Sequence, residues 1–436
     1  MIRTKITILK SFENFQLKST LFANYLLILY AFFLPISNKI ATNILIGVAI
    51  FTLFGGNLRE KFSNAIQDKI IISFFLFYMM YFIWLIGSEH TLNAFFKLKE
   101  FKYIIEISLI IYIVLQKEFV YKILGGFISG MLFSEIMSYC LFFDIPISLY
   151  FPFITLKPVH TNVPFMGNHT AYTICLSISI SIILYKLLTH QVKNKYLFFT
   201  YLLFFTTASV NIFIIYSRLG YILYGINILF TLIFVYRKQF LKTIFIFTMI
   251  TSTTYTLAFY YSPFFKDRTL AAMNDFKSSL NASYNSPGGI RIGYYVYAWE
   301  VIKEHPIFGV GTGDHISEVI KVVDQQETSL ANKEALYINY KSGYNASFDS
   351  EYLDILVQFG IIGLIVFFNI LFQIRSYEQN DRQLKFLQYL LILTMCIIAG
   401  PSLIFIPAEV GKTFILLLSL TLAIKPLNFT SAQRST

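Results

Sequence analysis

Residues 352–374, YLDILVQFGIIGLIVFFNILFQI, are apolar almost throughout, and Asp354 is their one charged side chain. A helix needs about twenty consecutive, mostly apolar residues to cross the hydrocarbon core of a bilayer. Residues 352–374 meet that requirement, and similar apolar runs recur along the chain. The sequence therefore predicts a membrane protein that is built from helices.

The composition excludes a soluble protein. Of the 436 residues, 56% are hydrophobic and only 14% are charged, whereas about a quarter of the residues of a soluble domain are charged. The formal net charge is +11, but in a membrane protein the basic residues set the orientation, so we expect no nucleic-acid partner. Cys140, Cys175 and Cys396 all lie in apolar runs, which argues against a disulfide framework and against a zinc site.

The predicted fold class is all-α, a polytopic integral membrane protein with about twelve transmembrane helices. Nine spans are expected in residues 1–261 and three in residues 352–424, followed by a tail over 425–436. The twelve apolar runs lie near residues 21–36, 40–56, 70–87, 101–116, 119–143, 169–188, 196–216, 219–236, 241–261, 352–374, 384–404 and 407–424.

The basic residues predict the orientation. Twenty lysines and arginines lie in the termini and in the connections on one side, against six in the short connections on the other side. Because cytoplasmic connections are the more basic ones, both termini are expected in the cytoplasm. The long connection over 262–351, between the ninth and tenth spans, would then lie outside, which in a bacterium is the periplasm. Its stretch Gly293–Glu304 has aromatic residues at helical spacing, so we expect a partly helical loop domain with a function.

Two arginines are candidate anion-binding residues on the outer side. Arg218 lies in the stretch Tyr216–Gly220, YSRLG, where the hydrocarbon ends, and its planar guanidinium could bind a lipid-linked phosphate. The alternative is a boundary arginine that snorkels to the interface. Arg291 follows a proline and two glycines in Ser286–Arg291 and precedes an aromatic helix. Its alternative is a solvated surface residue.

Two further outer stretches offer other chemistry. The alternating glycines of His305–His315, HPIFGVGTGDH, resemble a phosphate-binding loop, but no strand precedes them and no GK[ST] follows. A tight backbone turn against the membrane domain is the favoured interpretation. Asp349 and Glu351 lie where the loop re-enters the membrane. They could act as a general base beside a lipid headgroup, or they could cap the tenth span.

In order and spacing, these stretches resemble the O-antigen ligase and polymerase superfamily of membrane glycosyltransferases. The resemblance covers most of the chain, and the segments that carry it are SRLG (217–220), Arg291 with Trp299, HPIFGVGTG (305–313) and EYLDILVQFGIIGL (351–364). Members use a glycan carried on undecaprenyl diphosphate. Ligases transfer it to the lipid A core oligosaccharide, and polymerases join it to another lipid-linked repeat unit.

The resemblance implies roles for single residues. Arg218 and Arg291 would bind the donor pyrophosphate, with Ser217, Gly309, Gly311 and Glu351 in support. Two guanidinium groups can offset the charge that accumulates on a diphosphate leaving group, so no metal and no cofactor is expected. None of the familiar metal-ligand spacings occurs in the sequence.

One position departs from the ligase pattern. Ligases carry a histidine eleven residues before the glycine that corresponds to Gly360, and this chain has Asp349 there. Asp349 is therefore the candidate general base, and an aspartate at this place also resembles some polymerases. His305 and His315 are fallback bases, although the histidine of the HPxFGxG motif is ordinarily structural in the superfamily.

The predicted function is an O-antigen ligase of the bacterial inner membrane with a periplasmic active site. Its partners would be the undecaprenyl-diphosphate-linked glycan donor, the lipid A core acceptor and membrane lipids. The alternative in the same superfamily is a polymerase of O-antigen or capsule repeat units. The alternative of another class is a transporter or flippase of lipid-linked sugars, which would have the same composition but needs a charge-lined path across the membrane.

Overall fold

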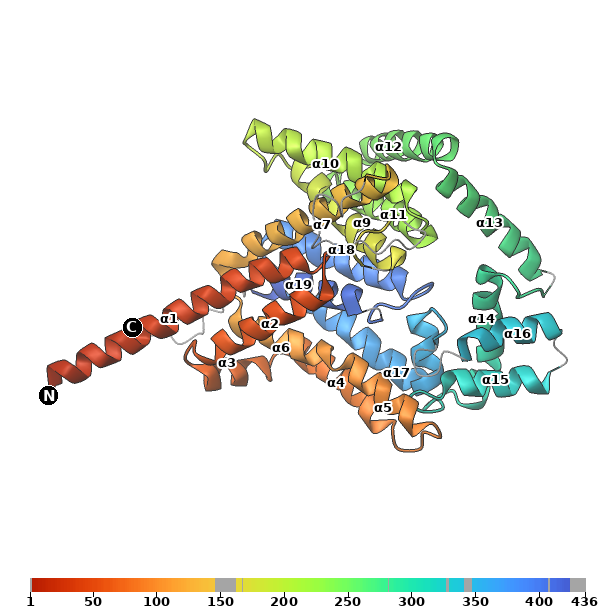
Figure 1. Cartoon of the computed structure of the whole chain (residues 1–436), viewed down its shortest axis with the longest axis horizontal. Helices are drawn as coiled ribbons and strands as arrows, with labels where there is room; N and C mark the ends of the chain where they lie inside the picture. The colour runs from red at the N-terminus through yellow and green to blue at the C-terminus, as the bar shows by residue number, and fades with distance from the viewer. Residues whose placement is uncertain are drawn as a thin grey trace.

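The computed structural model describes residues 2–145, 162–166, 168–280, 282–326, 329–340, 347–406 and 408–423, and every regular element in these ranges is helical (Figure 1). The elements are α1 Ile2–Phe33, α2 Asn38–Leu53, α3 Leu58–Ala65, α4 Lys69–Ile83, α5 Thr91–Phe101, α6 Tyr103–Val114, the short 3₁₀ helix η1 Lys117–Phe119, α7 Val120–Phe142, α9 His169–Leu188, α10 Lys195–Ile214, α11 Arg218–Val235, α12 Phe240–Tyr261, α13 Pro263–Leu280, α14 Pro287–Glu304, α15 His315–Gln325, α16 Leu330–Tyr340, α17 Glu351–Ser376, α18 Arg382–Ile398 and α19 Ala408–Leu422.

The prediction of a polytopic helical membrane protein is confirmed. A helix lies over each of the twelve predicted spans, and α9 has the predicted bounds, His169–Leu188. Within the described residues, six helices are long and apolar enough to cross a membrane: α7 with η1, α9, α10, α11, α12 and α17. A seventh span results if α3 and α4, which meet at a bend of 70°, are counted together. The count of twelve stays a prediction, since several apolar helices are shorter.

Helix α9 forms the centre of the membrane part. Its side chains are buried from Ala171 to Tyr185 on every face, and it packs against α10 and α11. Serines at 177, 179 and 181 let neighbouring backbones approach closely, as small residues do in membrane helices. Helix α12 is the opposite case, since only Thr243 and Ala258 are buried in it, so most of its surface is left for lipid.

The helices of the long connection form a second group. Helices α14, α15 and α16 gather at one end of the molecule, away from the start of α1, and α13 runs along the edge between α12 and α14 (Figure 1). They share an apolar cluster that includes Tyr294, Val319 and Leu336. Phe348 and Val357 extend this cluster to the first turns of α17, so the loop helices rest on the membrane part through α17.

Candidate functional site

The start of helix α11 fixes the position of Arg218. Ser217 caps the helix, since its hydroxyl oxygen accepts a hydrogen bond from the amide of Gly220 at 3.3 Å. The same hydroxyl lies 2.9 Å from that of Thr173 on α9. Gly220 packs so tightly on Thr173 that an added Cβ would lie 2.6 Å from it. The first turn of α11 is therefore held against α9, and Arg218 projects from a fixed point.

Arg218 forms an ion pair with α13. Its Nη1 atom lies 2.8 Å from Oδ2 of Asp275, and the two side chains are 27% and 13% exposed. Seven residues earlier, on the same face of α13, the guanidinium of Arg268 stacks over the ring of Tyr216 at 3.4 Å. The face of α13 that carries Arg268 and Asp275 therefore contacts the α10–α11 connection at Tyr216 and the start of α11 at Arg218.

Arg291 forms an ion pair with Asp349. The glycines before it belong to the first turn of α14, which begins at Pro287 and is capped by Ser286. The Nε and Nη2 atoms of Arg291 donate to Oδ2 of Asp349 at 3.1 Å and 2.8 Å. Both side chains are about half exposed, at 47% and 49%. The pair is thus accessible to a substrate at the surface.

The residues after Asp349 anchor it. Ser350 caps α17, because its hydroxyl accepts from the amide of Leu353 at 3.3 Å, so the alternative that Asp349 is the cap is wrong. Tyr295 donates to the Ser350 hydroxyl at 2.7 Å. The buried Glu351 carboxylate accepts from the amide of Ile404 at 2.9 Å and holds the α18–α19 connection. Asp349 itself has a left-handed backbone (φ 54°) and its carboxylate points to Arg291.

The two ion pairs are neighbours. Gly288 packs on Asp275 so closely that an added Cβ would lie 2.5 Å from Oδ2, and Gly288 precedes Arg291 by three residues. Burial lowers the pKa of the Arg268 guanidinium, and the charges of Arg218 and Arg291 lower it further. The structure therefore brings the two predicted arginines and Asp349 into one cluster, and it adds Arg268 and Asp275, which the sequence did not reveal.

The fallback histidines lie elsewhere. His305 is exposed at the end of α14. His315 is buried at the start of α15, with its ring edge-on to Phe348 at 5.1 Å and its Nε2 atom 3.8 Å from Asp354. The roles of His305 and His315 stay predictions.

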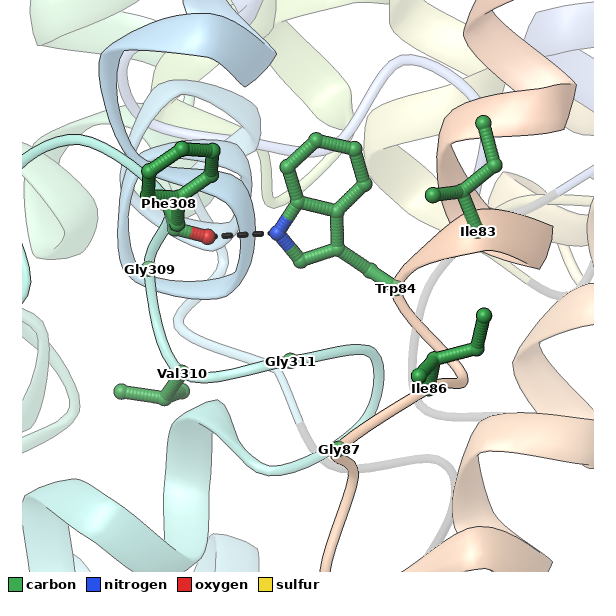
Figure 2. A pocket seen from close by; sticks show the side chains of 8 residues that line it. All are labelled: Ile83, Trp84, Ile86, Gly87, Phe308, Gly309, Val310 and Gly311. Carbon is green, nitrogen blue, oxygen red and sulfur yellow. Dashed lines mark hydrogen bonds between the residues drawn. The ribbon is translucent and has the colours of Figure 1, made fainter.

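The glycine-rich stretch 305–313 is a structural turn. The amides of Val310 and Gly311 donate to the carbonyls of Val357 and Gln358 on α17, at 2.9 Å and 3.0 Å. The helical geometry of α17 is interrupted at Gly360, whose φ is 61°. Residues 305–313 pack against the backbone of α17 at this break. The stretch also packs on the α4–α5 connection, where the indole of Trp84 donates to the carbonyl of Phe308 (Figure 2). Amides that a phosphate would need already bind carbonyls, which favours the tight-turn interpretation.

We expect Gly309→Ala to destabilise the protein strongly. Gly309 has φ +67°, and a Cβ there would lie 2.4 Å from the backbone of Gln358. The left-handed backbone alone costs about 1–3 kcal/mol for a residue with a side chain, and the clash adds to it. The measurement is the unfolding temperature of detergent-purified protein. Gly125→Ala is the matched control, because a Cβ at that helical position meets nothing within 4 Å. Equal unfolding temperatures for the two variants would contradict the prediction.

The comparison with known families agrees with this geometry. Residues 202–368 match the family model described as O-Antigen ligase. This match supports the predicted resemblance to the O-antigen ligase and polymerase superfamily. The match runs from α10 through the loop helices into α17, and it therefore contains both arginine–aspartate pairs. No curated protein matches the chain significantly. The superfamily consists of glycosyltransferase-like enzymes that use lipid-linked glycans and lipid acceptors.

A metal ion needs a group of suitable ligand side chains. Over the described ranges, no group of three or more histidine, cysteine, aspartate or glutamate side chains could hold a metal ion. The metal-free chemistry that the superfamily resemblance implies stays a prediction, to be tested with a chelator.

Proposed function

We propose that this protein is an O-antigen ligase that transfers a glycan from undecaprenyl diphosphate to the lipid A core on the periplasmic face of the inner membrane. One observation carries the proposal. Arg218, at the start of the membrane helix α11, and Arg291, on the loop helix α14, converge on one cluster beside Asp349. A lipid-linked diphosphate needs cations at the membrane surface, and an acceptor hydroxyl needs a base next to them.

The cluster suits a direct transfer. Asp349 would take the proton of the acceptor hydroxyl while that oxygen bonds to the anomeric carbon of the donor sugar. The bond between this carbon and the diphosphate oxygen breaks, and the diphosphate leaves with the electron pair. Arg218 and Arg291 would stabilise the charge that develops on it, since guanidinium groups bind phosphates in a bidentate manner. In this scheme the arginines take the place of a metal ion.

The orientation and the twelve spans belong to the same proposal. The start of α1 and the loop helices lie at opposite ends of the molecule (Figure 1), which supports a cytoplasmic N-terminus if the loop helices are periplasmic. The excess of basic residues on the side of the termini supports the same orientation. The second half of α1 and the shorter apolar helices α2, α4, α6, α18 and α19 would complete the twelve spans.

A repeat-unit polymerase is the second candidate, and Asp349 favours it. The superfamily ligases carry histidine at this place, and the loss of that histidine suits an acceptor site of another kind. A transporter of lipid-linked sugars is less well supported. Arg218 and Asp349 lie at or next to the starts of the membrane helices α11 and α17, whereas a transporter needs ionisable groups near the midplane.

Purified protein in lipid nanodiscs tests the proposal. It is given undecaprenyl-diphosphate-linked repeat units together with lipid A core, and the products are separated by size. Glycan on the lipid A core supports the ligase, and longer chains that remain on undecaprenyl diphosphate support the polymerase. No transfer to either acceptor, with lipid-linked glycan moved across vesicle membranes instead, would overturn both. The lipopolysaccharide profile of a deletion strain gives the same distinction in cells.

Arg291→Ala is expected to raise the apparent KM for the donor or to lower turnover. Because Arg218 and Arg291 would face one diphosphate, the double alanine variant should lose less than the product of the two single losses. Transfer by the purified variants is the measurement. Strictly multiplicative losses would show that the two arginines act at separate sites.

EDTA should leave transfer intact, and inhibition by EDTA that Mg²⁺ reverses would contradict the metal-free scheme.

A further inference from the structure

We propose that Arg268 is a third guanidinium of the donor diphosphate site, and that Asp275 is a counterion which the diphosphate displaces. The proposal rests on the proposed function, because it assumes a lipid-linked diphosphate as donor. It concerns two residues of α13, a helix that carries none of the site residues predicted from the sequence. Arg268 would bind the substrate directly, and Asp275 would tune how tightly the arginines bind it.

The placement of Arg268 suits a phosphate ligand. Its guanidinium carbon lies over the ring of Tyr216, 3.4 Å from the ring centroid, so the ring covers one side of the group and leaves N–H donors for a ligand. Among the described residues no carboxylate lies within ion-pair distance of Arg268, and its Nε donor has no hydrogen-bond acceptor. Arg218 and Arg291 each have an aspartate. Arg268 is therefore a pre-oriented cation that lacks a counterion in the described part of the chain.

The charges of the cluster favour an anion. The three guanidinium groups of Arg218, Arg268 and Arg291 face the two carboxylates of Asp275 and Asp349, so the cluster carries an excess of one positive charge. A diphosphate carries negative charge on both phosphates and can be bound by several arginines at once. If it takes the place of Asp275, three guanidinium groups face it. The excess charge and the planar donors together match this ligand.

Asp275 is the partner more easily exchanged. Although its Oδ2 atom lies 2.8 Å from Nη1 of Arg218, the atom makes no hydrogen bond of good geometry with any described residue. The Nε donor of Arg218 also lacks an acceptor there. The Arg291–Asp349 pair differs, since two donors reach one oxygen. Asp275 is therefore held by charge attraction and not by a well-formed hydrogen bond. A phosphate, which offers more oxygens than the Asp275 carboxylate, would bind Arg218 better.

The test measures the binding of undecaprenyl diphosphate without sugar to full-length protein in nanodiscs. Arg268→Gln should weaken binding about tenfold or more, as expected when a charge-assisted hydrogen bond is lost. Asp275→Asn should tighten binding, because it removes the competing carboxylate but keeps the shape. Lys277→Gln is the matched control, since it removes an exposed positive charge from the same helix and should change little. Thermal unfolding of each variant verifies that it is folded.

The outcomes separate this inference from the proposed function. If the wild type binds the diphosphate lipid and Arg268→Gln binds it within twofold, the role of Arg268 is refuted and the proposed function stands. Weaker or unchanged binding by Asp275→Asn would refute the counterion role, since it would show that Asp275 only supports the fold. If the wild type binds no diphosphate lipid, the proposed function itself fails. Arg268→Lys should restore only part of the affinity, because lysine keeps the charge but loses the planar stack on Tyr216.

Discussion

Arg218→Ala is expected to abolish glycan transfer without reducing the amount of protein in the membrane, and Arg218→Lys should rescue it poorly. Lysine keeps the positive charge but cannot donate two parallel hydrogen bonds to a phosphate. The measurement is lipopolysaccharide laddering at matched expression, followed by transfer with purified protein. Arg237→Ala is the control, because Arg237 is an exposed arginine just beyond the other end of the same helix.

The ion pair with Asp275 requires a second control. Arg218→Ala leaves the Asp275 carboxylate, which is 13% exposed, without its partner, and an unpaired, largely buried charge costs stability. The variant Arg218→Ala with Asp275→Asn removes that charge. If the double variant transfers as well as Asp275→Asn alone, the loss came from the unpaired carboxylate and not from the donor site. Wild-type laddering in Arg218→Ala alone would show that Arg218 is only a boundary residue.

The positions of the helices could be predicted because a bilayer imposes a length and a composition on every span. Helix α9 has the predicted bounds. The break of α17 at Gly360 could not be predicted, because hydropathy does not record that residues 305–313 insert there through backbone hydrogen bonds. The glycines of both segments were visible in the sequence, but their contact joins residues about fifty positions apart.

The part of the candidate site that lies in short sequence motifs could be predicted. Arg218, Arg291 and Asp349 lie in stretches that resemble the superfamily, and the structure brings them into one cluster. Arg268 and Asp275 were missed, because α13 has the mixed polar sequence of a solvated helix. The available signal was their spacing of seven residues, which places both on one helix face. Only the tertiary structure shows that this face lies against Tyr216 and Arg218.

Asp349→Asn is expected to lower the rate of transfer about 10²–10⁴-fold, the range for the loss of a general base. Asparagine preserves the shape and can still accept a hydrogen bond from Arg291, but it cannot take a proton. Asp349→His should retain measurable transfer, because an imidazole can act as a base near neutral pH and superfamily ligases have histidine here. The measurement is the rate with purified protein in a defined lipid mixture. Glu300→Gln, which removes an exposed, lysine-paired carboxylate on α14, is the control and should change little.

The ion pair itself cannot account for a loss of this size. Arg291 and Asp349 are about half exposed, and a solvent-exposed pair contributes about 0–1 kcal/mol to stability. Asp349→Asn should therefore unfold at nearly the wild-type temperature while its transfer rate falls, and this combination identifies a chemical role. A rate within threefold of wild type would reject Asp349 as the base. His305 and His315 would then be replaced in turn, with the buried His315 requiring the same unfolding control because it packs against Phe348.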